Sequence, residues 1–144
     1  MAGIDEKLSF VPVRIALLTM SDTRAASDDK SGDLLAGRVG EAGHVLADRA
    51  IVKDDVAAIR AKVEQWIKDP SIDCVITTGG TGFTGRDVTP EAVKPLFEKE
   101  IEGFSTVFHM ISFDKVGTST IQSRACGGLA QGTYIFCLPG SPGA

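Results

Sequence analysis

The chain has 144 residues, of which 43% are hydrophobic and 24% are charged, close to the averages of globular proteins. This length is enough for a single domain, 1–144, with a buried core. The formal net charge of −4 argues against nucleic-acid binding, which requires a clustered excess of Lys and Arg. No apolar run approaches the roughly 18–20 residues of a membrane span, and the N-terminus lacks a signal-peptide hydrophobic region, so no membrane association is expected.

The cysteines and histidines are few and widely separated. Cys74, Cys126 and Cys137 lack metal-type spacing, so we expect reduced, buried thiols in a cytoplasmic protein. His44 and His109 are isolated, and packing is favoured over a metal or catalytic role for both. No Ser-His-Asp or Cys-His set can be assembled from them, which argues against nucleophilic catalysis by the protein itself.

The predicted elements alternate along the chain. Residues 1–12 are expected to form an extended tail, and the apolar, β-rich run at 13–19 predicts a strand covered on both faces. Ser31 is a candidate N-cap for the first helix, and Thr89 for a short helix with Pro90 at its first position. Further strands are expected at 45–52, 73–78 and 133–138, and helices at 32–42, 56–67, from 89, at 101–111 and at 124–130.

Alternating strands and helices predict an α/β domain with a largely parallel sheet. In open α/β sheets, ligands bind beyond the carboxyl ends of the strands. The polar segments that follow the first, third and last strands should therefore meet at one edge. These segments are Ser21-Asp22, Gly79 to Asp87, and Pro139 to Pro142.

The segment from Val75 to Glu91 contains the most informative pattern in the chain. A β-branched run leads into glycines at 79, 80, 82 and 85, then to Arg86-Asp87 and a helix start. Bare backbone N–H groups beside a helix start can hold phosphate oxygens. The Asp87 carboxylate would repel a phosphate, whereas Mg²⁺ between the two would bind both. The pattern therefore indicates a site for phosphate and magnesium.

Each motif also has a simpler interpretation. The glycines are compatible with a tight turn alone, and Asp87 with a surface ion pair to Arg86. Asp54 and Asp55 precede the helix at 56–67, and either carboxylate could cap it. Ser21 and Asp22 are compatible with a local Asx-type turn, and Pro139 to Pro142 with a strand exit.

The motifs together resemble the MoaB/Mog family of molybdenum-cofactor biosynthesis proteins, from about Val13 to the last residue. The strongest element is Thr78-Gly79-Gly80-Thr81-Gly82 followed by Arg86-Asp87-Val88-Thr89-Pro90-Glu91. Supporting elements are Ser21-Asp22, Asp29-Lys30-Ser31-Gly32, Ser123-Arg124 and Pro139-Gly140-Ser141-Pro142. Gly-Thr-Ser-Thr at 117–120 favours the MoaB branch.

The resemblance implies a three-layer α/β/α sandwich that assembles as a homotrimer or as a hexamer of two trimers. It implies Mg²⁺-dependent adenylylation of molybdopterin by ATP, which gives adenylyl-molybdopterin and pyrophosphate. It also leaves open a non-catalytic, oligomeric carrier of pterin or nucleotide, and contacts with other molybdenum-cofactor enzymes. Relatives commonly continue with another helix after the Pro-Gly-Ser-Pro turn, so a C-terminal helix is expected to be missing after Ala144.

The resemblance also assigns roles to individual residues. Asp87 and Asp54 are the expected catalytic residues, binding Mg²⁺ and orienting the phosphates. The substrate-binding residues implied with them are Gly79, Gly80, Thr81 and Gly82 as hydrogen-bond donors, and Ser21, Asp22, Pro139, Gly140 and Ser141 as pocket walls.

Overall fold

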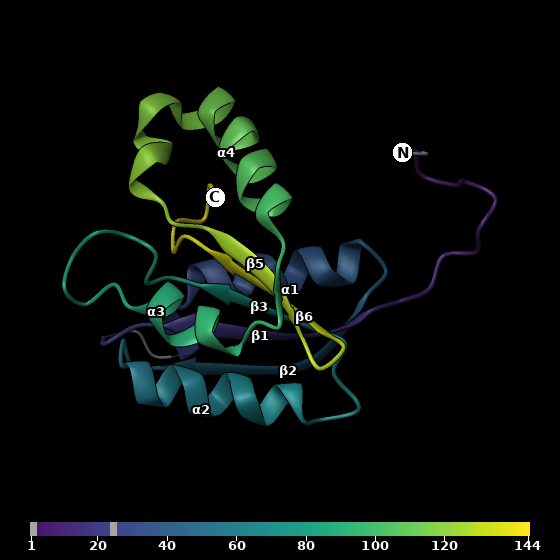
Figure 1. Ribbon diagram of the computed structural model, residues 1–144, viewed down its shortest axis with the longest axis horizontal. Coiled ribbons are helices and arrows are strands. Elements are labelled where there is room, and N and C mark those ends of the chain that lie inside the picture. Colours follow the sequence, from purple (N-terminus) through teal and green to yellow (C-terminus); the bar gives the residue numbers. More distant parts are fainter. Residues whose placement is uncertain (1–2, 24–25) are drawn as a thin grey trace.

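The computed structural model describes residues 3–23 and 26–144. Residues 1 and 2 of the predicted tail lie outside this range, and residues 3–12 contain no helix or strand. The elements shown in Figure 1 are β1 (Arg14–Met20), η1 (Ala26–Asp28), α1 (Lys30–Glu41), β2 (Val45–Val52), α2 (Val56–Ile67), β3 (Cys74–Thr78), α3 (Thr89–Val93), η2 (Lys94–Leu96), β4 (Lys99–Glu100), α4 (Glu102–Val116), η3 (Gly117–Gln122), β5 (Cys126–Ala130) and β6 (Thr133–Leu138).

The strands form one six-stranded sheet in the order β2-β1-β3-β6-β5-β4. Strands β1, β2, β3 and β6 pair in parallel, whereas β4 and β5 run antiparallel to their neighbours. The predicted, largely parallel sheet is therefore confirmed. Because the parallel strands end at the same edge, the loops after β1, β3 and β6 come together there.

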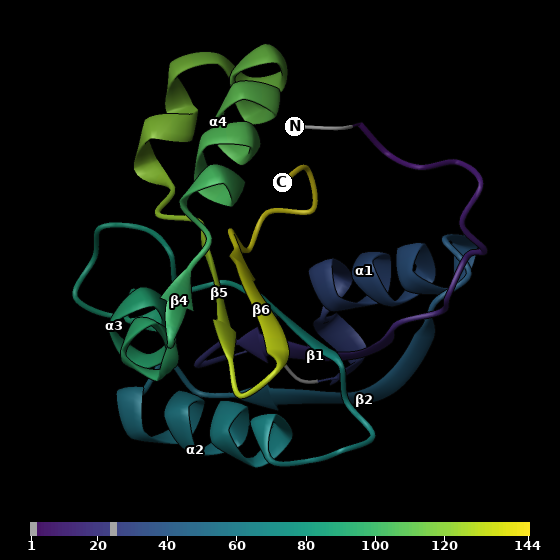
Figure 2. The same ribbon diagram turned by 45° about the vertical axis from the view of Figure 1, so that its right-hand side comes forward.

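The sheet is covered by helices on both faces, and β1 shows why. Its side chains alternate between the faces, and both sets are buried, as expected for a central strand. Ala16 and Leu18 pack with Ile59 of α2, whereas Leu17 packs with Val39 of α1. Figures 1 and 2 show α2 and α3 on one side of the sheet and α1 on the other. This is the expected three-layer α/β/α sandwich.

Helix α4 and the 3-10 helix η3 project away from the sheet as a hairpin (Figure 1). None of the fifteen residues of α4 is fully buried. The predicted helix at 101–111 is confirmed, with an extension to Val116. After η3 the chain returns to the sheet at the edge where β3 and β6 end, which brings the hairpin beside the predicted site.

The helix predicted at 124–130 is wrong, since Cys126–Ala130 forms strand β5. Its small residues provide space for aromatic rings. A Cβ atom on Gly127 would lie 2.9 Å from a ring carbon of Phe136, and one on Gly128 would overlap the ring of Phe97. The small residues of this segment therefore allow aromatic rings to pack against a strand. Residue type alone did not distinguish this strand from a helix of small residues.

Two predicted helix caps are also wrong. Helix α1 begins at Lys30, and its N-cap is Asp29, whose carboxylate accepts a hydrogen bond from the Gly32 N–H at 3.0 Å. Thr89 is the first residue of α3 rather than its cap, and its hydroxyl donates to the carbonyl of Gly79 at 2.9 Å. Asp29 caps the helix rather than Ser31 because its carboxylate is held in a fully buried position, where it also accepts a hydrogen bond from the Thr19 hydroxyl at 2.7 Å.

Candidate functional site

A pocket of about 610 Å³ opens at the carboxyl edge of the parallel strands. All the residues predicted for the site line it: Ser21, Asp22, Asp54, Gly79, Gly80, Thr81, Gly82, Asp87, Pro139, Gly140 and Ser141. Segments far apart in sequence thus meet at one edge, as the alternation of strands and helices predicted. The roles assigned to these residues remain predictions.

Asp87 is held in place by its own loop. One of its carboxylate oxygens, Oδ2, accepts hydrogen bonds from the backbone N–H and the hydroxyl of Thr84, at 3.0 and 2.7 Å. These bonds, opposed by partial burial, lower the pKa of Asp87, with smaller contributions from the Gly82 N–H and from Arg124. A Cβ atom on Gly82 would lie 2.8 Å from the same oxygen, so glycine there leaves room for the carboxylate. Asp87 is therefore fixed in its ionised form.

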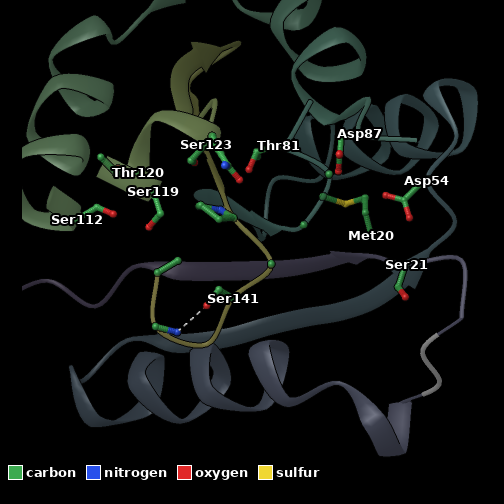
Figure 3. Close-up of a pocket in the computed structure, with 18 of the residues that line it drawn as sticks. Met20, Ser21, Asp54, Thr81, Asp87, Ser112, Ser119, Thr120, Ser123 and Ser141 are labelled. Atoms are coloured by element: carbon green, nitrogen blue, oxygen red, sulfur yellow. Dashed lines mark hydrogen bonds between the residues drawn. The ribbon is translucent and has the colours of Figure 1, made fainter. Parts of the chain in front are cut away.

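Asp54 lies just before α2, whose N-cap is its neighbour Asp55. The cap therefore does not account for Asp54. Burial raises the pKa of Asp54, and the negative charges of Asp22 and Asp87 raise it further, while Arg86 opposes them. Figure 3 shows Asp54 and Asp87 in the same corner of the pocket. The two carboxylates repel each other in this partly buried corner, and a cation bound beside them would relieve that repulsion.

The donor set suits Mg²⁺. This ion takes oxygen ligands and usually combines one or two protein carboxylates with water and substrate phosphates. Asp54 and Asp87 supply two carboxylates beside an open pocket. No group of three or more His, Cys, Asp or Glu side chains with metal-binding geometry occurs in residues 3–23 and 26–144. Two carboxylates beside an open pocket are the ligands that an ion shared with a phosphorylated ligand requires.

The glycine turn connects β3 to this corner. Gly79 has φ +103°, and a Cβ atom on it would lie 2.8 Å from the Met20 carbonyl oxygen, so no other residue fits without strain. Its N–H donates to the carbonyl of Leu138 at 3.0 Å. Gly79 therefore joins β3 to β6 and shapes the turn, while Gly80 and Thr81 remain the better candidates for donors to a ligand.

Arg124 organises the loop around the glycines. Its guanidinium donates to the carbonyls of Gly82 and Asp87, at 3.0 and 2.9 Å, and forms a bidentate pair with Glu91 at 2.8 and 2.9 Å. Its backbone N–H donates to the carbonyl of Thr81 at 3.0 Å. All of these donors bind groups of the protein. Arg124 therefore positions the loop that carries Asp87.

Arg86 pairs with Asp22, which excludes the simpler interpretation of a pair between Arg86 and Asp87. The guanidinium Nε and Nη2 donate to the two carboxylate oxygens at 2.9 and 2.8 Å. This hydrogen bonding lowers the pKa of Asp22. The same carboxylate accepts the backbone N–H of Asp54 at 3.1 Å. Asp22 thus lines the pocket but is engaged by protein groups.

A second wall of the pocket was missed by the sequence analysis. It is formed by hydroxyl-bearing residues of α4, η3 and the segment before β5, namely Ser112, Ser119, Thr120 and Ser123. Figure 3 shows Ser112, Ser119 and Thr120 on the side of the pocket away from Asp54. The Ser123 hydroxyl is buried and, within residues 3–23 and 26–144, has no hydrogen-bond partner. A ligand that enters the pocket could satisfy it.

None of the cysteine or histidine side chains lines the pocket. All three cysteines are buried and unbridged, as predicted, and burial raises the pKa of Cys74 to about 12. The His44 Nδ1 accepts the backbone N–H of Val13 at 3.0 Å, and the His109 Nδ1 is hydrogen-bonded to the Thr120 hydroxyl at the same distance. Their positions agree with packing roles.

Comparison with known proteins identifies the class to which this fold and pocket correspond. The family described as "Probable molybdopterin binding domain" matches residues 16–144, and the chain belongs to this family. Among the most similar relatives is molybdenum cofactor biosynthesis protein B of Escherichia coli K12, 52% identical over 132 residues, which cover 92% of this chain and 78% of that protein. The corresponding protein of Bacillus subtilis is 45% identical over 133 residues, with the same coverage.

Solved structures support the same assignment. A crystal structure of molybdenum cofactor biosynthesis protein B has a TM-score of 0.91 and 44% identity, covering 94% of this chain and 85% of that one. The tungsten cofactor synthesizing protein MoaB from Pyrococcus furiosus gives 0.83 and 37%, covering 94% and 87%. The resemblance to the MoaB/Mog family is therefore confirmed. Within residues 3–23 and 26–144, no helix is long and apolar enough to span a bilayer.

Proposed function

We propose that this member of a molybdenum-cofactor biosynthesis family is a cytoplasmic, Mg²⁺-dependent molybdopterin adenylyltransferase. ATP and molybdopterin would be its substrates, and adenylyl-molybdopterin and pyrophosphate its products. The observation that supports this most is the corner formed by Asp54, Asp87 and the glycine turn in a single pocket. The names of the relatives support the pathway, and the site chemistry supports the reaction.

The reaction requires positioning more than a protein nucleophile. An oxygen of the molybdopterin phosphate would attack the α-phosphorus of ATP, and the bond from that phosphorus to the β-bridging oxygen would break to release pyrophosphate. Mg²⁺ bound with the triphosphate would neutralise charge on the phosphates. Asp54 and Asp87 would orient the metal-bound phosphates, and the N–H groups of Gly80 and Thr81 would bind phosphate oxygens.

The two walls of the pocket suggest where each substrate binds. The acidic corner suits the cation-bound polyphosphate. The hydroxyl-bearing wall, with Ser112, Ser119 and the unpaired Ser123 hydroxyl, suits the pterin and its phosphate, which offer many hydrogen-bonding atoms. The Pro139 to Ser141 turn also lines the pocket and would contact a bound substrate.

We infer that the chain assembles as a trimer or hexamer, in part because of α4. Five apolar residues of this helix, Val107, Met110, Ile111, Phe113 and Val116, are each at least 50% exposed. Exposed apolar side chains gathered on one helix are typical of a protein interface. Sedimentation velocity tests the inference: a trimer or larger species is expected for the wild type and dissociation for Met110→Glu. A monomeric wild type at micromolar concentration would contradict it.

The catalytic role of Asp87 can be tested with a matched control. Asp69 has a similar local geometry, since its Oδ1 accepts the backbone N–H and the hydroxyl of Ser71 at 2.8 and 2.6 Å, but it lies before β3, at the opposite edge of the sheet. We expect Asp87→Asn to reduce adenylyl-molybdopterin formation by at least about 100-fold, as for loss of an electrostatic catalytic group, and Asp69→Asn to leave it unchanged.

The same assay separates the enzyme from a carrier. Formation of adenylyl-molybdopterin by the wild type, followed by mass spectrometry together with pyrophosphate release, is the expected result. Equal product from wild type and Asp87→Asn would remove the proposed role of this carboxylate. Saturable molybdopterin binding without pyrophosphate release, in conditions where an active adenylyltransferase works, would identify a non-catalytic binding protein instead.

A further inference from the structure

The ion pair between Arg86 and Asp22 crosses the pocket edge. Asp22 follows β1 and lines the pocket, whereas Arg86 belongs to the loop between β3 and α3. The pair is exposed, with 65% of the Arg86 side chain and 36% of the Asp22 side chain accessible to solvent. An exposed pair of this kind adds little to stability. Its location at the site therefore needs another explanation.

The charges around the pair indicate what that explanation is. Three carboxylates, those of Asp22, Asp54 and Asp87, line the same part of the pocket. The Arg86 guanidinium interacts electrostatically with Asp22 and also with Asp54. A polyphosphate that entered this corner would meet three negative charges. A metal ion held by Asp54 and Asp87 would offset two of them, and the polyphosphate would then compete with Asp22 for the Arg86 guanidinium.

The loop that carries Arg86 has room to move its side chain. Residues 83–86 are exposed, and 65% of the Arg86 side chain is accessible to solvent. The guanidinium is a planar fork that binds a phosphate in the same bidentate manner as a carboxylate. A terminal phosphate carries more charge than one carboxylate, so it competes favourably for the fork.

We propose that Arg86 binds the terminal phosphates of the nucleotide and that Asp22 holds it in the empty site as an internal competitor. On entry of the triphosphate, the guanidinium leaves the carboxylate of Asp22 for the β- and γ-phosphates, which later depart as pyrophosphate. Asp22 then tunes nucleotide affinity without contacting the nucleotide as a ligand. This inference rests on the proposed function, because it assigns Arg86 to the polyphosphate half of the same site.

The chain offers a matched control pair. Arg14 and Asp73 form the same bidentate geometry, with Nε and Nη2 donating at 3.0 and 2.9 Å, and are similarly exposed at 47% and 41%. Arg14 begins β1 and Asp73 precedes β3, which places the pair at the opposite edge of the sheet. Changes there report on the loss of an exposed ion pair without altering the pocket.

The test is calorimetric titration of the full chain with MgATP, magnesium pyrophosphate and AMP. We expect Arg86→Ala to weaken binding of ATP and pyrophosphate by roughly 10- to 100-fold, as for loss of charge-assisted hydrogen bonds, and to change AMP binding by less than twofold. Asp22→Asn should strengthen pyrophosphate binding a few-fold, and this gain should disappear in the Asp22→Asn/Arg86→Ala double variant. Arg14→Ala should bind like the wild type.

The outcomes are distinguishable. Weaker pyrophosphate binding by Asp22→Asn would overturn the competitor role, because it would show that Asp22 positions Arg86 for binding. Unchanged binding by Arg86→Ala, with an intact wild-type response, would overturn the phosphate contact while leaving the proposed function in place. A wild type that binds neither ATP nor pyrophosphate would remove the proposed function together with this inference. Thermal unfolding of each variant verifies that it is folded. Arg86→Lys is included as the conservative change.

Discussion

Replacement of Arg124 by methionine tests whether this side chain holds the glycine loop in place. Methionine keeps an unbranched apolar stem but removes every guanidinium donor. The carbonyls of Gly82 and Asp87 then lose their hydrogen bonds, and Glu91 loses its ion pair. The backbone bond from residue 124 to the Thr81 carbonyl remains, so β5 should stay in register while the loop loosens.

The expected loss of stability follows from these contacts. A hydrogen bond from a charged donor contributes about 1.5–3 kcal/mol, but the Arg124 side chain is 33% exposed, so water replaces part of each bond. The two carbonyl bonds then contribute about 2–3 kcal/mol together, and the half-exposed pair with Glu91 adds about 0–1 kcal/mol. For a chain of this size the loss corresponds to a fall in Tm of about 7–13 °C.

The control is Arg60→Met. The Arg60 guanidinium donates to the carbonyls of Glu91 and Ala92, at 3.1 and 3.0 Å, and thus also braces α3. Both variants should lower Tm by similar amounts, but only Arg124→Met should speed chymotrypsin cleavage after Phe83, which is 66% exposed in the loop. Equal cleavage rates in the two variants, measured well below both melting temperatures, would refute the idea that Arg124 orders the loop.

Two further substitutions test other parts of the fold. Gly79→Ala should lower the free energy of unfolding by at least about 2 kcal/mol, because positive φ is unfavourable for alanine and the new Cβ would meet the Met20 carbonyl. Gly85→Ala should lower it by less than about 0.5 kcal/mol. Urea unfolding measures both changes. Hydrogen bonding to Arg14 lowers the pKa of Asp73 to about 2, so this carboxylate stabilises the folded state above pH 4 and loses that effect as the pH falls toward 2. The Tm advantage of wild type over Asp73→Asn should therefore shrink across that interval, and a constant difference would contradict the assignment.

The acidic corner and the glycine turn could be predicted because their determinants are local. Strand β3 ends where its β-branched run ends, and the glycines follow directly. The parallel arrangement of β1, β3 and β6 then brings the segments after them to one edge, whatever the details of packing. What each side chain contacts across that edge depends on long-range geometry. The partner of Arg86 is 64 residues away, and a neighbour in sequence was an equally reasonable choice.

The hydroxyl-bearing wall could not be predicted because its position depends on one antiparallel strand. Had residues 124–130 formed a helix, the segment before it could have entered the domain at either edge of the sheet. In the structure, β5 pairs antiparallel with β6, so its first residue, Cys126, stands opposite Cys137 near the end of β6. That pairing forces Ser123 to the carboxyl edge and directs η3 and α4 over the pocket.

The same pairing gives the two halves of the site different mechanical support. The acidic corner follows the ends of the parallel strands β2 and β3, and Asp87 is fixed by Thr84 and by the loop that Arg124 braces. The opposite wall is formed by α4, which has no fully buried residue, by η3 and by the segment before β5, and this hairpin joins the sheet through β4 and β5. Movement of the hairpin would therefore change the width of the pocket while leaving the carboxylates in place. An assembly that covered α4 would restrict this movement, which connects the proposed oligomer to the position of the hydroxyl-bearing wall.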